Sequence, residues 1–157
     1  MSDTPRKAHY LEDFTVGMRF VSRSHTMTEA QIIAFAREFD PQPFHTDPVA
    51  AETSVFRGLA ASGWHTAAVS MRLFVDLRIG AADGMIGAGV ENLRWPRPVR
   101  PDDTLQVEAE VVSVRASKTR PERGIVVLEV ITRNQHGDVV QSYRPSCIVP
   151  ARPMSAS

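Results

Sequence analysis

SGWHTAAVSMRLFVDLRI, residues 62–79, is the longest segment of the sequence with a helical pattern. Ser62 is a residue type that caps helices, and Gly80 is one that ends them. Apolar side chains cover most of the circumference of such a helix: Ala67, Ala68, Val69, Met71, Leu73, Phe74, Val75, Leu77 and Ile79. A helix with so little polar surface is usually enclosed by other elements. We therefore expect a buried central helix, with Met71 and Phe74 in the core.

The sequence after this helix is typical of β-strands, since it is rich in β-branched residues and alternates partly with a period of two. The expected strands are residues 90–95, 104–114, 124–133 and 139–149, and residues 18–26 fit an earlier strand. A tight turn at 134–137 and a longer polar connection at 115–124 favour hairpins, so the strands should be antiparallel. The sequence thus predicts an α+β fold, with a curled antiparallel sheet wrapped around the central helix. Pro145 then requires an edge position or a bulge.

Two further helices are expected between the first strand and the central helix. Thr28 can cap the first, with Gln31 at the capping-box position. Ile32, Phe35, Ala36 and Phe39 recur at helical spacing, which predicts a helix to about residue 39 with one buried face. Asp47 followed by Pro48 should begin a short helix over residues 49–53.

Length and composition indicate one ordinary globular domain over residues 1–157, with loose tails at about 1–10 and 151–157. Of the 157 residues 43% are hydrophobic and 23% charged, and 18 basic residues balance 18 acidic ones. No global charge therefore favours nucleic acid or an anionic membrane as a partner. The single cysteine, Cys147, lies in an apolar run and is expected to be an inert core residue. The absence of a leader pattern or a membrane-spanning stretch predicts a cytoplasmic location.

FDPQPFHTDP, residues 39–48, is the segment that suggests chemistry. Three prolines restrict the backbone, so we expect a stiff, non-helical loop that carries Asp40 and His45. A carboxylate and an imidazole held together could form part of an active site. They could equally be structural, with Asp40 turning the chain after a helix and His45 making a hydrogen bond. A metal site is not expected, because no third ligand accompanies them at zinc-like spacing.

The sequence resembles the MaoC-like dehydratase family, which includes the (R)-specific enoyl-CoA hydratases. The resemblance rests on FAREFDPQPFHTDPVAA (residues 35–51), on LAASGWHTAAVSMRLFVD (59–76) and on RWPRPVRPDDTLQVEAEV (94–111). The family pattern is a helix ending in Asp, then Asn-Pro-x-His, then Asp-Pro opening a short helix. Gln42 stands here in place of the usual Asn, and Ser62 in place of the usual His before the glycine.

This resemblance implies a hot-dog fold and an acyl-CoA hydro-lyase, with Asp40 and His45 activating water. The N–H of Gly63, at the start of the central helix, would bind the thioester oxygen where negative charge develops. Ser62, Trp64 and His65 are the expected substrate-binding residues. Coenzyme A would enter only as part of the substrate, with no separate cofactor. The family pattern also implies a homodimer or a higher homo-oligomer. One of Arg94, Arg97 and Arg100, which flank the prolines of RWPRPVR, could meet a CoA phosphate, or these arginines could be solvated or contact another subunit.

Two other functions remain open at this point. A hot-dog thioesterase would carry its acid on the central helix, where Asp76 lies near the end. A non-catalytic acyl-CoA-binding subunit would need no acid or base. The pairing of Asp40 with His45 favours the hydro-lyase over both alternatives.

Overall fold

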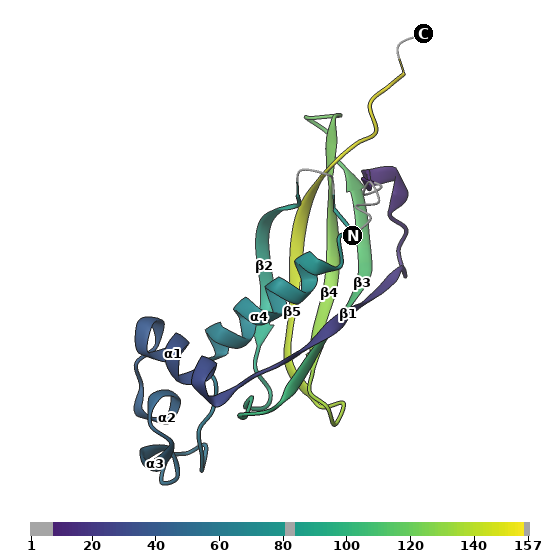
Figure 1. Ribbon diagram of the computed structural model, residues 1–157. Coiled ribbons are helices and arrows are strands. Elements are labelled where there is room, and N and C mark those ends of the chain that lie inside the picture. The colour runs from purple at the N-terminus through teal and green to yellow at the C-terminus, as the bar shows by residue number, and fades with distance from the viewer. Residues whose placement is uncertain (1–7, 81–83, 156–157) are drawn as a thin grey trace, which may run out of the picture.

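The computed structural model describes residues 8–80 and 84–155 (Figure 1). Its helices are α1 (Glu29–Phe39), α2 (Pro43–Thr46), α3 (Pro48–Ala51) and α4 (Gly63–Asp76), preceded by the 3₁₀ turn η1 (Leu11–Asp13). Its strands are β1 (Arg19–Thr26), β2 (Ile86–Arg94), β3 (Thr104–Ala116), β4 (Arg123–Arg133) and β5 (Val139–Pro150). The strands form one antiparallel sheet in the order β1-β3-β4-β5-β2. Helix α4 lies against the sheet, and α1, α2 and α3 gather near its N-terminal end.

This arrangement is the hot-dog fold that the sequence predicted, and its core lies between α4 and the three middle strands. On the helix, Leu73 is fully buried and Phe74 is 6% exposed. Alternate residues of β3, β4 and β5 face them, including Val107, Leu128 and Val149. Full burial of one such aliphatic side chain contributes about 1.5–3 kcal/mol to folding.

Helix α4 is not enclosed on all sides in the single chain, contrary to the expectation from its apolar circumference. Trp64 is 60% exposed, Met71 46% and Val75 60%, and these residues lie on one face at helical spacing. The expectation that Met71 belongs to the core was therefore wrong. The helix also ends at Asp76, three residues earlier than expected, because Arg78 adopts a left-handed conformation with φ of 56°.

The segment before α4 follows its capping signals closely. The Thr28–Gln31 capping box is present, and the Asp47 side chain accepts from the N–H groups of Val49 and Ala50. Phe39, however, is 65% exposed, so the buried face of α1 is shorter than expected. Residues 43–46 form the one-turn helix α2, although a non-helical loop was expected. Proline fits there because the first helical position needs no N–H donor.

Strand β5 is an interior strand between β4 and β2, so Pro145 is not at an edge, which was the first of the two positions expected for it. The paired residues of β4 and β5 skip Arg144 and Pro145 without a change of register, so the ladder is interrupted at the proline. Pro145 pairs with Val90 of β2, and the register between these two strands shifts on both sides of this pair, between Gly87 and Gly89 and between Glu91 and Arg94.

The C-terminal segment makes defined contacts as far as Arg152. The N–H of Arg152 donates to Glu12, and its guanidinium donates to Asp13 at 2.6 Å. The C-terminal segment is thus held against η1 up to this residue. Residues 1–7 and 156–157 of the predicted tails lie outside the described part of the chain.

Candidate active site

Asp40 directly follows α1 as its C-cap, and its carboxylate is held by two donors. Ser62 Oγ donates to Oδ2 at 2.7 Å, and Gln42 Nε2 donates to Oδ1 at 2.6 Å. Burial acts to raise the pKa of Asp40, but these two hydrogen bonds and the charge that His45 can carry outweigh it. The pKa of Asp40 is therefore below its ordinary value of 3.8, and the carboxylate is ionised at neutral pH.

His45 lies beside this carboxylate, on the short helix α2. Its Nδ1 is 2.6 Å from the carbonyl oxygen of Ala60, and a carbonyl can only accept, so Nδ1 carries the proton. In the neutral ring Nε2 is then an acceptor, and it lies 3.4 Å from Asp40 Oδ2. That distance exceeds an ordinary hydrogen bond. The ring is only 5% exposed and packs edge-on against Phe44 at 4.6 Å between ring centroids. The two acceptor atoms consequently lie side by side in a nearly buried position.

Gly63 opens α4 directly after Ser62, which brings the N-terminus of this helix next to Asp40. Ser62 Oγ accepts from the N–H of Trp64, and the Ser62 carbonyl accepts from the N–H of Thr66. Among the hydrogen bonds of the described residues, none uses the N–H of Gly63. The start of α4 therefore presents a free donor, at the positive end of a helix dipole, close to the Asp40–His45 pair.

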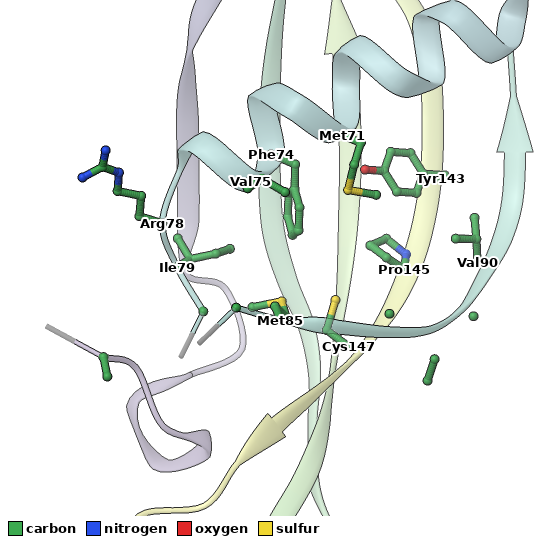
Figure 2. A pocket seen from close by; sticks show the side chains of 16 residues that line it. Met71, Phe74, Val75, Arg78, Ile79, Met85, Val90, Tyr143, Pro145 and Cys147 are labelled. Atoms are coloured by element: carbon green, nitrogen blue, oxygen red, sulfur yellow. The ribbon is translucent and has the colours of Figure 1, made fainter. Parts of the chain in front are cut away.

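Farther along α4 a cavity of about 370 Å³ lies between the helix, β5 and β2 (Figure 2). Its walls are mainly apolar and include Met71, Phe74, Ile79, Met85 and Pro145. Met71 lies eight residues after Gly63, about 12 Å along the helix axis. The cavity is thus separate from the Asp40–His45 pair but shares α4 with it.

Comparisons with known proteins identify the family of this chain. A family model described as the MaoC like domain matches residues 13–134. The chain belongs to the MaoC-like domain family.

Individual relatives show how far the similarity extends. The crystal structure of a MaoC-like dehydratase from Rhodospirillum rubrum is 51% identical, with a TM-score of 0.87, and covers 94% of this chain and 100% of that one. The uncharacterized protein YdeM of Bacillus subtilis is 34% identical over 125 residues, which are 80% of this chain and 87% of YdeM. The (R)-hydratase from A. caviae, described as involved in PHA biosynthesis, is 25% identical with a TM-score of 0.72. That match covers 88% of this chain and 99% of the hydratase.

The structure brings together Asp40, His45, Ser62 and Gly63, as the sequence suggested, and it directs the Ser62 hydroxyl to Asp40. Ser62 is fully buried, and its hydroxyl is engaged by both Asp40 and the N–H of Trp64. This geometry favours positioning of the carboxylate over contact with a substrate. Gln42, which sequence reasoning noted only as a departure from the family pattern, supplies the second donor to Asp40.

Trp64 and His65 leave α4 in different directions. Trp64 is exposed and meets Trp95 edge-on, with 5.3 Å between ring centroids. His65 is 7% exposed and stacks on Phe35 at 4.6 Å and 6°. Burial, with a smaller contribution from His25, lowers the pKa of His65 from 6.5 to about 4, so the ring is neutral. His65 is not among the described residues that line the cavity, and its surroundings favour packing.

Trp95 is the residue of this region that sequence reasoning missed. It follows β2, and its indole lies against the Cα of Gly63. The indole N–H donates to Gln141 Oε1 on β5 at 2.8 Å. The only signal in the sequence was an aromatic residue beside the prolines of RWPRPVR, and nothing local connects it to Gly63.

The three arginines considered for CoA phosphates are in different environments. Arg100 donates to the carbonyl oxygens of Phe56, Gly58 and Leu59, so it braces the loop that leads to Ala60, the partner of His45. Arg97 lies 3.8 Å from Asp138, with 63% of its side chain exposed. Arg94 is exposed at the end of β2. Only Arg94 and Arg97 have the exposure that a phosphate contact requires.

Asp76, the acid that a thioesterase would use, is already paired with two arginines. Arg23 lies 2.8 Å from its Oδ2 and Arg72 lies 3.1 Å from it. The hydrogen bond from Arg23, and then that from Arg72, lower the pKa of Asp76 against the opposing effect of burial. Cys147 lines the cavity, where burial raises the pKa of its thiol to about 11 and keeps it protonated. Neither side chain is placed as a free base or nucleophile.

Within residues 8–80 and 84–155, no three His, Cys, Asp or Glu side chains come together as a metal ion would require. No helix in the same ranges has the length and hydrophobicity needed to span a bilayer.

Proposed function

We propose that this MaoC-like protein is a hydro-lyase that adds water reversibly to the double bond of a 2-enoyl-CoA, giving a 3-hydroxyacyl-CoA. The observation that carries the proposal is the Asp40–His45 pair, with 3.4 Å between Oδ2 and Nε2 and the opposite ring nitrogen anchored on Ala60. The (R)-hydratase from A. caviae, which has the same fold, supports the choice of reaction. Because the two proteins are only 25% identical, the choice of a 2-enoyl-CoA as the substrate rests on the chemistry of the site.

In the hydration direction, one water molecule donates its two O–H groups to Asp40 and His45. As its oxygen forms a bond to C3, one proton passes to the Asp40–His45 pair, because water at neutral pH is a weak nucleophile. The π electrons of the double bond move toward the thioester and form an enolate. The proton held by the pair then returns to C2, which completes the addition without a metal or a redox cofactor.

The enolate oxygen bears the charge that develops during this step, and the N–H of Gly63 is proposed to bind it. A free backbone donor at the start of a helix is preorganised for such an oxyanion, so no reorganisation is needed as charge builds. Gln42 and Ser62 hold Asp40 in its ionised form at the same end of α4.

The acyl chain is proposed to run along α4, from Gly63 toward the cavity beside Met71 and Phe74. The cavity is mainly apolar, as an acyl chain requires. A proton-transfer site at one end and an apolar cavity farther along the same helix fit a thioester substrate with a tail of several carbons.

The protein is also proposed to act as a homodimer or a higher homo-oligomer. Strand β2 is an edge strand, and apart from Leu93 all of its residues are exposed, Ile86 and Val90 among them. The exposed face of α4 adds Trp64, Met71 and Val75 nearby. An unpaired edge beside exposed apolar side chains is typical of a surface that another chain covers.

A single assay with crotonyl-CoA tests the function against its alternatives. Hydration removes the conjugated double bond and lowers the ultraviolet absorbance without release of free thiol. A thioesterase would release thiol, and a binding subunit would bind the thioester with neither change. Loss of absorbance without release of thiol is the expected result. If enoyl-CoA substrates of several chain lengths instead give release of thiol, or binding with neither change, the hydro-lyase is rejected.

A further inference from the structure

The cavity beside α4 contains one buried hydroxyl group without a partner. Tyr143 is 5% exposed and lines the cavity from β5, and its phenolic oxygen makes no hydrogen bond with any described residue. In Figure 2 this hydroxyl points toward Met71, across the space between the strand and the helix. It is therefore a polar point on an otherwise largely apolar wall.

A buried hydroxyl of this kind does not help the protein to fold. An unsatisfied buried polar group costs about 1–3 kcal/mol, whereas phenylalanine would fill nearly the same volume without that cost. Buried polar groups in native proteins are almost always paired, so an unpaired one requires an explanation. For a hydroxyl in the wall of a cavity, one explanation is a ligand that completes the hydrogen bond.

The position of Tyr143 connects it to the proposed active site. Gln141 and Tyr143 are inward-facing neighbours on β5, about 7 Å apart along the strand. Gln141 holds Trp95, which covers Gly63 at the start of α4. Gln141 is thus connected to the proposed active site through Trp95, and Tyr143 is the next inward-facing residue of β5 in the direction of the cavity.

The groups around the Tyr143 hydroxyl favour an uncharged ligand group. Burial raises the pKa of Tyr143 well above its ordinary value, so the phenol keeps its proton and can donate. The Cys147 thiol nearby is also protonated, and the side chain of Arg78 points away from Tyr143 in Figure 2. Arg78 lines the cavity, but a carboxylate beside Tyr143 would lose its hydration without gaining this guanidinium as a counter-ion, because the Arg78 side chain points away from Tyr143 (Figure 2).

We propose that the substrate carries a neutral oxygen, a hydroxyl or a ketone, in the distal part of its acyl chain, and that the Tyr143 hydroxyl donates a hydrogen bond to it. This inference rests on the proposed function, since it assumes that the acyl chain lies along α4. It makes Tyr143 a specificity-determining residue, distinct from the residues that act on water.

Binding of saturated thioesters tests the inference without turnover. The probes are octanoyl-CoA, analogues with one hydroxyl on successive carbons of the distal half of the chain, and the analogue with a terminal carboxylate. Titration calorimetry should show that the best hydroxy analogue binds the wild-type protein about 10-fold more tightly than octanoyl-CoA. The carboxylate analogue should bind more weakly than octanoyl-CoA.

Tyr143→Phe removes only the hydroxyl and should reduce this preference to about twofold or less, while the melting temperature stays unchanged or rises. Tyr10→Phe, at the only other tyrosine of the sequence, should retain the full preference. A wild-type protein without preference, a Tyr143→Phe variant that keeps it, or a marked fall in melting temperature would overturn the inference.

The outcomes also separate this inference from the proposed function. Hydration of enoyl-CoA by a protein whose binding shows no Tyr143-dependent preference for the hydroxy analogues would leave the hydro-lyase standing and reject the role of Tyr143. A preference that depends on Tyr143, in a protein that hydrates no enoyl-CoA, would support the inference and reject the hydro-lyase. No binding of any acyl-CoA would reject both.

Discussion

The indole of Trp95 occupies the space in which a side chain on Gly63 would begin. A Cβ atom on Gly63 would lie 2.6 Å from Cδ2 and 2.7 Å from Cε2 of the indole, well inside van der Waals contact. Glycine is thus needed at this position for the approach of Trp95, quite apart from any approach of a thioester. A large substitution at Gly63 would disturb both relationships at once.

Gly63→Ala should therefore destabilise the protein by about 1–3 kcal/mol through overpacking against Trp95. In a Trp95→Ala background the same substitution should cost less than half as much, because the clash is gone. Chemical denaturation of the four proteins in this cycle measures the coupling between the two residues. Additive losses would show that Trp95 does not occupy this space in solution.

The hydrogen bonds to Asp40 should set the acid limb of the pH–rate profile. Asp40 acts as a base only when ionised, so kcat/KM should fall as the pH drops through its pKa. Ser62→Ala and Gln42→Ala each remove a donor that lowers this pKa, so each should move the acid limb to higher pH. Ser24→Ala, at an exposed serine, provides the control. An acid limb that stays in place in both variants would mean that Asp40 does not control it.

His65 should make the protein less stable in mild acid. Its pKa is about 4 in the folded protein against an ordinary 6.5, so between these values the unfolded chain binds the extra proton. The stabilising effect of a neutral His65 is complete above about pH 6.5. As the pH falls toward 4 this effect is lost, and the free energy of unfolding decreases by at most about 3 kcal/mol.

The variant His65→Phe should lack this part of the pH dependence, whereas His136→Phe, at an exposed histidine, should retain it. The free energy of unfolding, measured from pH 7 to about pH 4, gives the comparison. Curves for His65→Phe and the wild type that run parallel over this range would contradict the assignment.

Two neighbouring positions on α4 should differ sharply in their effect on stability. Leu73→Ala opens a cavity at a fully buried position and should cost about 2–5 kcal/mol. Met71→Ala, at a side chain that is 46% exposed in the single chain, should cost less than about 1 kcal/mol at protein concentrations at which the chain is monomeric. Equal losses in chemical denaturation at these concentrations would mean that both faces of α4 are buried within the single chain.

The predictable part of the fold is the part that local signals specify. Thr28 and Asp47 cap helices in the way that their neighbours in sequence indicate, and the strands after α4 follow their β-branched patterns. The start of β2 was placed too late, because Gly87 and Gly89 weaken the pattern of a strand. The open face of α4 was unpredictable, since an apolar pattern does not reveal whether the covering element belongs to the same chain.

The candidate site likewise has a part that local motifs specify and a part that depends on tertiary contacts. Asp40, His45 and Gly63 could be chosen from the sequence because they lie in short motifs. The bond from Ser62 to Asp40 joins residues 22 apart in the chain, and Trp95 reaches Gly63 from beyond β2. Such contacts depend on the tertiary fold, so a sequence pattern alone could not supply them.

The most direct test of the central claim is the rate of enoyl-CoA hydration in Asp40→Asn and His45→Gln. Each substitution keeps the approximate shape and hydrogen-bonding capacity of the side chain but removes a group that can accept the proton of water. With melting temperatures near that of the wild type, each should lower kcat by about 100-fold or more. The double variant should lose far less than the product of the two effects, because the pair acts on one water. Hydration by either single variant at close to the wild-type rate would contradict the account.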